Sequence, residues 1–189
     1  MIRADYKDRA DAVKILSDSF ADNKSVNYII KQDSKKDQRI RKLMEYSFDV
    51  CYLFGDVFFS ENKKACALLL YPDKKKTTIK SILLDLKLIF SCIGVENIKK
   101  ALTRESKIKQ IQPKESMNYL WFIGVNPTDQ NTGIGSTLIN EIIMDSVHKK
   151  RPVFLETSTL KNLPWYKKFD FEIYNELDLG YKLYFLKRA

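Results

Sequence analysis

The chain has 189 residues, a formal net charge of +9, and 44% hydrophobic and 12% aromatic residues. That length predicts one well-filled domain. The low content of glycine and proline, six and five residues, argues against a fibrous or disordered protein. The basic charge favours anionic partners such as a phosphorylated cofactor, nucleic acid or an anionic membrane, although scattered lysines are also typical of a solvated surface.

Cysteine and histidine are too sparse for a zinc site or a disulfide framework. The cysteines Cys51, Cys66 and Cys92 are widely spaced, and His148 is the only histidine. We therefore expect no metal and no disulfide, which fits a reducing cytosol. The charged N-terminus does not resemble a signal peptide, and the longest apolar stretch, 79–93, is too short and too charged to span a membrane. These features predict a cytoplasmic protein.

The first part of the chain predicts two helices followed by a hairpin. Apolar residues at helical spacing predict helices over 7–21 and 37–53, and Gly55 ends the second. Two apolar runs, 57–59 and 65–71, predict the two strands of a hairpin with a short polar turn between them.

A helical insert is predicted next, at about residues 78–112. It begins with two helices over 78–103 that join near Gly94. Residues 82–93 are apolar nearly all round the predicted helix, which fits either a buried helix or the wall of an acceptor pocket.

The last part alternates strands with helices. Two apolar runs, 119–125 and 153–155, predict buried strands, and two alternating runs about Gly180, 171–177 and 181–186, predict a final antiparallel hairpin. A helix of about four turns follows the first of these runs after a turn that contains glycine, and a short helix is predicted over 162–169. The order of elements predicts a single α/β domain over 1–189, with helices on the faces of a central mixed sheet.

The turn after the strand at 119–125 carries the strongest chemical signal. A helix begins directly after Gln130-Asn131-Thr132-Gly133-Ile134-Gly135. The first N–H groups of a helix have no internal partner, and the helix dipole makes that end positive, so it attracts anions. Glycines at 133 and 135 would let a pyrophosphate approach these N–H groups, and Ser136 and Thr137 add hydroxyl donors.

Other interpretations of this turn are weaker. A Walker A loop needs a lysine after the glycines, and none is present. A dinucleotide fingerprint needs a third small residue where Leu138 stands, although Glu156 lies about twenty residues further on, where that motif has its acidic residue. A plain helix start with flexible glycines and no ligand is a further alternative.

The sequence around this turn resembles the GNAT superfamily of N-acetyltransferases, whose cofactor motif is Gln/Arg-x-x-Gly-x-Gly/Ala. The preceding Phe122-Ile123-Gly124-Val125-Asn126-Pro127 is similar to the family's strand before that motif, and Asn162 and Tyr166 resemble its Asn-x-x-x-Tyr pattern. The resemblance covers residues 117–187 and implies a GNAT-like acyl-CoA N-acyltransferase fold, in which a mixed, mostly antiparallel sheet is flanked by helices. Asp170 replaces the glycine of the family's Tyr-x-x-x-Gly-Phe, and aspartate tolerates a left-handed turn.

The resemblance implies an N-acetyltransferase in which a primary amine of a small molecule or peptide attacks the thioester of acetyl-CoA directly, in a ternary complex. It implies that a backbone N–H near Val125 polarises the thioester carbonyl. The residues implied to bind acetyl-CoA are Ile123, Gly124, Val125, Gln130, Asn131, Thr132, Gly133, Ile134, Gly135, Ser136, Thr137, Asn162 and Tyr166.

Two side chains are candidates for proton transfer. Tyr166 is the candidate acid because its phenol can protonate the departing thiolate, and the alternative is a core tyrosine beside Trp165. Glu156 ends a central strand and is a candidate to relay a proton from the amine, and the alternative is a salt bridge with a surface lysine. Asn162 either contacts the cofactor arm or caps the helix that follows.

The sequence leaves two other functions open. A protein with the GNAT fold can bind CoA without catalysing transfer. The net charge of +9 and the basic segment 99–114 fit a nucleic-acid-binding module, but no helix-turn-helix, zinc pattern or aromatic RNA-binding motif supports that function. We expect no membrane partner, and the sequence leaves a homodimer open.

Overall fold

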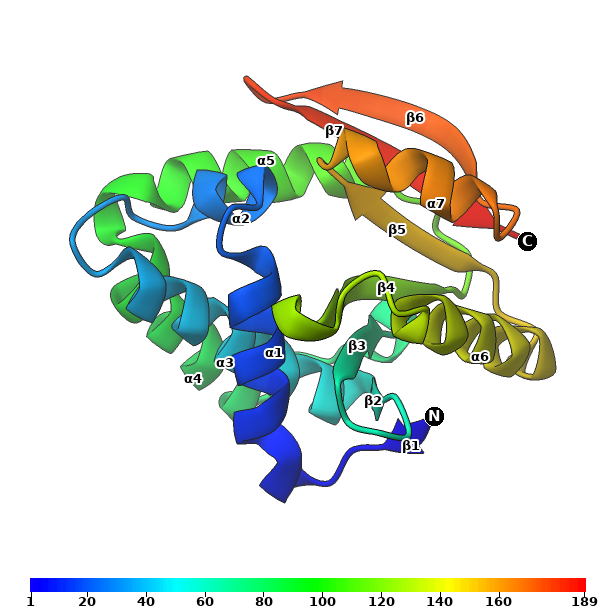
Figure 1. Ribbon diagram of the computed structural model, residues 1–189. Helices are drawn as coiled ribbons and strands as arrows, with labels where there is room; N and C mark the ends of the chain where they lie inside the picture. Colours follow the sequence, from blue (N-terminus) through cyan, green and yellow to red (C-terminus); the bar gives the residue numbers. More distant parts are fainter.

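The computed structural model describes all 189 residues, and its seven strands form one sheet in the order β1-β2-β3-β4-β5-β7-β6 (Figure 1). Every pair of neighbouring strands is antiparallel except β4 and β5, which are parallel. The strands are β1 (Ile2–Arg3), β2 (Gly55–Phe59), β3 (Ala65–Leu70), β4 (Asn118–Val125), β5 (Val153–Thr157), β6 (Glu172–Asp178) and β7 (Lys182–Arg188). The prediction of a mixed, mostly antiparallel sheet is confirmed.

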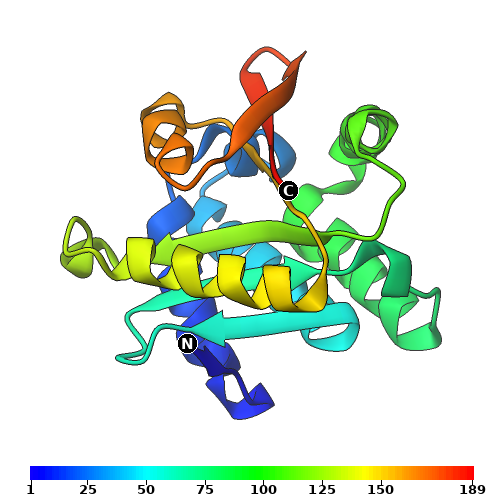
Figure 2. The same cartoon turned by 90° about the vertical axis from the view of Figure 1, so that its right-hand side faces the viewer.

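Helices flank the sheet on both faces (Figures 1 and 2). The α-helices are α1 (Arg9–Phe20), α2 (Lys24–Ile29), α3 (Lys36–Phe54), α4 (Ile79–Leu88), α5 (Ile98–Ile111), α6 (Ile134–Lys149) and α7 (Leu163–Lys167). The predicted helices over 7–21 and 37–53 are confirmed as α1 and α3, and the two helices expected to join near Gly94 are α4 and α5. None of these helices combines the length and the apolar character needed to cross a membrane.

β3 shows how two cores share one sheet. Cys66 and Leu68 belong to a core cluster with α1 and α3, whereas Ala67 and Leu69 belong to a second cluster with α6. Because successive side chains of a strand point to opposite faces, a strand covered on both sides must be apolar at every position. This explains the unbroken apolar run that predicted the second strand of the hairpin.

α5 forms a third, smaller core on the C-terminal strands. Its Ile108 packs with Leu183 and Phe185 of β7, and all three side chains are buried. α5 therefore covers the β7 end of the sheet, while α1 and α3 cover the β2–β4 end.

Two short elements were not predicted, and one prediction is wrong in part. β1 has two residues and α2 has six, too few for a hydrophobic period to show. The helix at 82–93 is not buried throughout. Leu84 and Leu88 pack against the core, but α4 exposes large apolar side chains, namely Ile79, Ile82, Leu83 and Leu86.

Candidate active site

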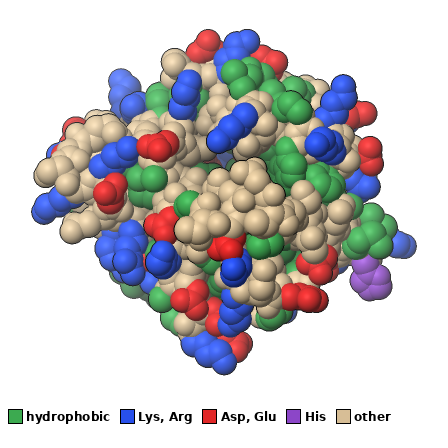
Figure 3. Space-filling model, in the orientation of Figure 1, with side chains coloured by type: hydrophobic (Ala, Val, Ile, Leu, Met, Phe, Trp, Pro, Cys, Tyr) green, Lys and Arg blue, Asp and Glu red, His purple; other side chains and the backbone are tan.

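β4 and β5 separate soon after they begin. Only two residue pairs join them, Asn118 with Val153 and Tyr119 with Phe154. β4 then continues to Val125 and β5 to Thr157, and Figure 1 shows the two arrows diverging. Figure 3 shows a hollow near the middle of this face, where the strands part. Backbone groups on the facing edges lack a partner strand, so a ligand that carries amide groups could pair with them.

The other edge of β4 contains a β-bulge. Leu68 of β3 pairs with Phe122 and Leu69 pairs with Leu120, so Trp121 has no partner in the register. A bulge adds one residue to a strand and breaks the alternation of faces. As a result both Trp121 and Phe122 pack on the side of α1 and α3, whereas Leu120 packs on the side of α6. The bulge thus places a tryptophan beside the opening between β4 and β5.

The turn that follows β4 exposes a row of unpaired backbone N–H groups. Asn131 and Gly133 have left-handed backbones, with φ of 62° and 86°. No N–H from Asn131 to Ser136 donates to a backbone carbonyl, and Thr137 is the first to do so, to the Gly133 carbonyl at 3.0 Å. Successive N–H groups in such a turn form a concave anion site, and α6 adds the positive end of its dipole.

The glycines near this turn serve different purposes. A Cβ on Gly133 would meet no atom within 4 Å, so the residue is required by its positive φ and leaves open space beside the N–H groups. A Cβ on Gly135 would lie 3.1 Å from Cγ2 of Val125, and one on Gly124 would lie 2.9 Å from Oγ of Ser19. These two glycines allow α6 and α1 to approach β4 closely.

The polar side chains of the turn are partly engaged within the protein. The Ser136 hydroxyl accepts a hydrogen bond from Nε1 of Trp165 at 3.0 Å, which ties α7 to the start of α6. Thr137 donates its hydroxyl to the Gly133 carbonyl at 3.3 Å, so this donor, expected to be available to a ligand, is used within the helix. The Gln130 amide donates to the Val125 carbonyl at 3.4 Å.

Tyr166 and Asn162 lie on and just before α7, next to this turn. Tyr166 is buried, and its ring packs edge-on against Trp165 and Phe171. Burial alone raises the pKa of its phenol, and no hydrogen bond contributes to that shift. Asn162 stands at the N-cap position of α7, but its side chain makes no capping hydrogen bond. The interpretation of Asn162 as a side-chain cap is therefore wrong, and its amide is free.

Glu156 lies on the opposite face of β5, toward α5. Its carboxylate accepts hydrogen bonds from the Tyr119 hydroxyl and, at 2.9 Å, from Nε2 of Gln112. It forms no ion pair, so the alternative of a salt bridge with a surface lysine is wrong. Burial raises the pKa of Glu156, and the hydrogen bonds from Tyr119 and Gln112 oppose that rise.

The predicted residues thus form two groups on either side of the β4–β5 opening. The end of β4, the turn, the start of α6 and α7 lie together, whereas Glu156 stands apart on the α5 side. The partners of Glu156, Tyr119 and Gln112, were not predicted. They lie 37 and 44 residues away in the chain, and only the aromatic run at 119–121 hinted at a feature there.

No family model matches the chain. Solved structures match it over nearly its whole length. One is described as histone acetyltransferase HPA2 and related acetyltransferase from Corynebacterium glutamicum, with a TM-score of 0.69, 16% identity, and coverage of 100% of this chain and 94% of that chain. Another is arylalkylamine N-acetyltransferase 2 from Aedes aegypti, with a TM-score of 0.63, 16% identity, and coverage of 100% and 97%.

A third is a putative acetyltransferase of the GNAT family from Desulfovibrio desulfuricans, with a TM-score of 0.54, 12% identity, and coverage of 100% and 96%. The chain has the GNAT acetyltransferase fold. The expectation of this fold is therefore confirmed, and the doubly wound parallel sheet that a dinucleotide fingerprint requires is absent.

Proposed function

We propose that this chain is an N-acetyltransferase that transfers an acetyl group from acetyl-CoA to a primary amine of a small molecule or peptide. The observation that carries the proposal is the continuity between the unpaired edge of β4 and the unpaired N–H groups of the turn from Asn131 to Ser136. One extended ligand with an amide-containing arm and a pyrophosphate would satisfy both. Acetyl-CoA is such a molecule.

The residues fit this ligand at three places. The pyrophosphate would occupy the open space beside Gly133, next to the unpaired N–H groups of the turn. The arm would lie along the β4 edge at Ile123–Val125, in place of a neighbouring strand. The free amide of Asn162, on the α7 side of the opening, would contact the arm.

Glu156 and Tyr166 are proposed to move the two protons of the reaction. The acceptor must be a neutral amine to attack, so its ammonium form first loses a proton to solvent. The nitrogen lone pair then forms the new bond to the acetyl carbon, and Glu156 accepts the proton that the nitrogen loses as the amide forms. The bond between the acetyl carbon and sulfur then breaks, and Tyr166 donates its phenolic proton to the sulfur. The positions of these residues on opposite faces of the opening support separate roles, one toward the acceptor and one toward CoA.

Nucleic-acid binding is less well supported. Basic and acidic side chains are interspersed over the face shown in Figure 3, as expected of a solvated surface. A DNA-retention assay at rising salt checks this directly, because a phosphate-binding protein loses affinity steeply with salt.

Two measurements test the proposed function. Acetyl-CoA should raise the melting temperature of the protein saturably, and NAD should raise it much less. A thiol-release assay over a panel of primary amines should then detect CoA formation that depends on the amine. Stabilisation by acetyl-CoA without transfer to any amine would support a non-catalytic CoA-binding protein, and absence of both effects would refute the proposal.

A further inference from the structure

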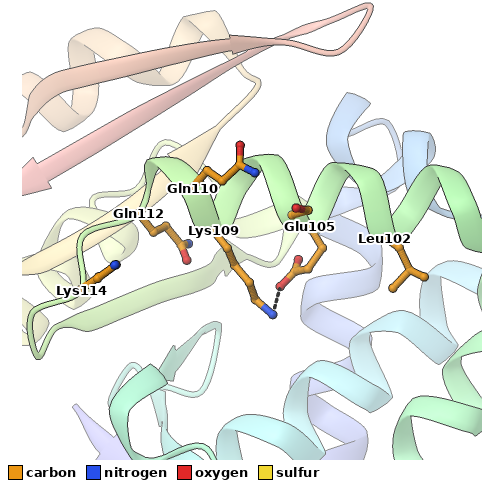
Figure 4. A pocket seen from close by; sticks show the side chains of 7 residues that line it. Leu102, Glu105, Lys109, Gln110, Gln112 and Lys114 are labelled. Atoms are coloured by element: carbon orange, nitrogen blue, oxygen red, sulfur yellow. Dashed lines mark ion pairs between the residues drawn. The ribbon is translucent and has the colours of Figure 1, made fainter.

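A groove runs along α5 and the residues that follow it. Its cavity volume is about 570 Å³, within the range of small-molecule sites. Figure 4 shows that Leu102, Glu105 and Lys109 of α5, and Gln112 directly after it, point away from the β6–β7 hairpin. Gln112 lines this groove and also donates to Glu156, so the groove leads to the proposed base.

Three aromatic rings from α3 and β4 contact one another in a row, and the last of them, Tyr119, donates to Glu156. The Tyr46 ring meets Trp121 edge-on, with centroids 6.1 Å apart, and Trp121 lies 6.5 Å from Tyr119. All three side chains are only half-buried, although the strand and the helix that carry them are central. Half-exposed aromatic rings provide faces on which a cation can lie.

Two of these rings donate hydrogen bonds to carboxylates. The Tyr46 hydroxyl donates to Asp85 at 2.7 Å, and the Tyr119 hydroxyl donates to Glu156. Burial, then the adjacent Asp85, and then the charge of Glu105 raise the pKa of Tyr46. The charge of Glu105 also contributes to the raised pKa of Tyr119, after burial and Glu156. Glu105 lines the groove, and its side chain points to the same side of α5 as Gln112, which donates to Glu156 (Figure 4).

The positive groups nearby are held by other partners or are exposed. Arg104 donates to the Tyr181 hydroxyl at 3.1 Å and to the Ser25 hydroxyl at 2.6 Å. Lys109 pairs with Glu105 at 3.4 Å, but their side chains are 67% and 53% exposed, so the pair is weak. Lys114 lines the groove beyond Gln112. A ligand ammonium could displace Lys109 from Glu105 at little cost.

We infer that the acceptor is a diamine or polyamine, with one amine at Glu156 and a second ammonium held by Tyr46, Trp121, Asp85 and Glu105. This inference rests on the proposed function. The reacting amine must be neutral to attack the thioester, so it carries no charge that could pair with the remaining carboxylates. A second charge on the same molecule would remain throughout the reaction and could bind both the carboxylates and the rings.

A matched pair of acceptors tests the second charge. Diaminobutane and butylamine share a carbon chain and differ by one amine. We expect kcat/KM for diaminobutane to exceed that for butylamine by about tenfold or more, from a charge-assisted hydrogen bond and a cation–π contact. Equal kcat/KM for the two amines would overturn the inference.

A variant assigns the preference to the groove. In Glu105→Gln, the preference for diaminobutane over butylamine should fall by about fivefold or more. Glu61→Gln makes the same charge change at an exposed position of the β2–β3 turn and should leave the preference unchanged. Equal effects of the two substitutions would show that net charge alone causes the preference, against the inference.

Binding can be measured without turnover. With CoA present, diaminobutane should raise the melting temperature more than butylamine does, and Glu105→Gln should remove the difference. If diaminobutane binds in this way but no acetyl group is transferred, the proposed function fails and the inference about the groove holds. If transfer occurs but neither binding nor rate favours diaminobutane, the inference fails and the proposed function holds.

Discussion

The two sides of the β4–β5 opening are built in different ways. On the α6 side, the proposed cofactor site consists mainly of backbone N–H groups within one turn, from Asn131 to Ser136. On the α5 side, the proposed acceptor site consists of side chains from α3, α4, α5, β4 and β5. A ligand common to many enzymes can be bound by the backbone of one short segment, whereas a ligand particular to one protein needs side chains assembled from distant segments.

The largest expected effect is a loss of rate on the cofactor side, where Tyr166 is the proposed proton donor to sulfur. Tyr166→Phe keeps the ring and its packing but removes the proposed proton donor. Single-turnover rates of transfer should fall by about 10²–10⁴-fold, while acetyl-CoA affinity changes little. Near-normal rates would return Tyr166 to the role of a packing residue.

The next effect concerns the acceptor side. Glu156→Gln should lower the rate at neutral pH by about 10²-fold because the proposed base is lost. The folding stability of the Glu156→Gln variant should not be lower than that of the unchanged protein at neutral pH. A buried carboxyl with a raised pKa contributes its full stability below its unfolded pKa and loses it as pH rises through the folded pKa.

Removal of this charge should therefore leave the melting temperature at neutral pH unchanged or higher. Activity and thermal melting measured on the same preparation check both expectations. A large loss of stability in Glu156→Gln would instead identify Glu156 as a structural residue.

A third prediction addresses the turn. Gly133→Asn keeps a residue that tolerates the left-handed backbone but places a side chain in the open space beside the N–H groups. CoA affinity should fall by about tenfold or more, as expected when charge-assisted hydrogen bonds are lost. Isothermal titration with CoA measures the change.

Gly180→Asn is a matched control for this variant. Gly180 has a φ of 82°, and a Cβ there would also meet nothing within 4 Å, but it lies in the β6–β7 turn. Similar CoA affinity in the two variants would contradict a pyrophosphate site at Gly133. Gly135 is a poorer choice, because a side chain there would press on Val125.

The smallest expected effect is a shift in pH dependence. The hydrogen bond from Tyr119 lowers the pKa of Glu156 against the effect of burial, so Tyr119→Phe should raise that pKa. The acidic limb of kcat/KM, measured with one amine throughout, should then move to higher pH, because the base must be deprotonated to act. An unmoved limb would remove Glu156 from the role of base.

The sequence predicted the structure of the turn after β4 far better than the contacts around Glu156, and the reason is physical. The turn, its glycines and the left-handed Asp170, whose φ is 61°, depend on neighbours within a few residues. The bulge at Trp121 depends on how β4 pairs with β3, and the hydrogen bonds to Glu156 join distant segments. No local pattern encodes such contacts. The apolar period of α4 likewise could not show which of its faces the core would cover.

The two residue pairs between β4 and β5 have a consequence for motion. Strands β1–β4 and strands β5–β7 form two half-sheets that pair at one end only, so no ladder of backbone hydrogen bonds holds their far ends together. A ligand between β4 and β5 would supply hydrogen bonds where the two strands no longer pair with each other. Hydrogen–deuterium exchange should therefore show amides from Leu120 to Val125 that exchange by local opening in the free protein. When CoA binds, their exchange should slow in step with the amides of β5, as the half-sheets come to move as one body.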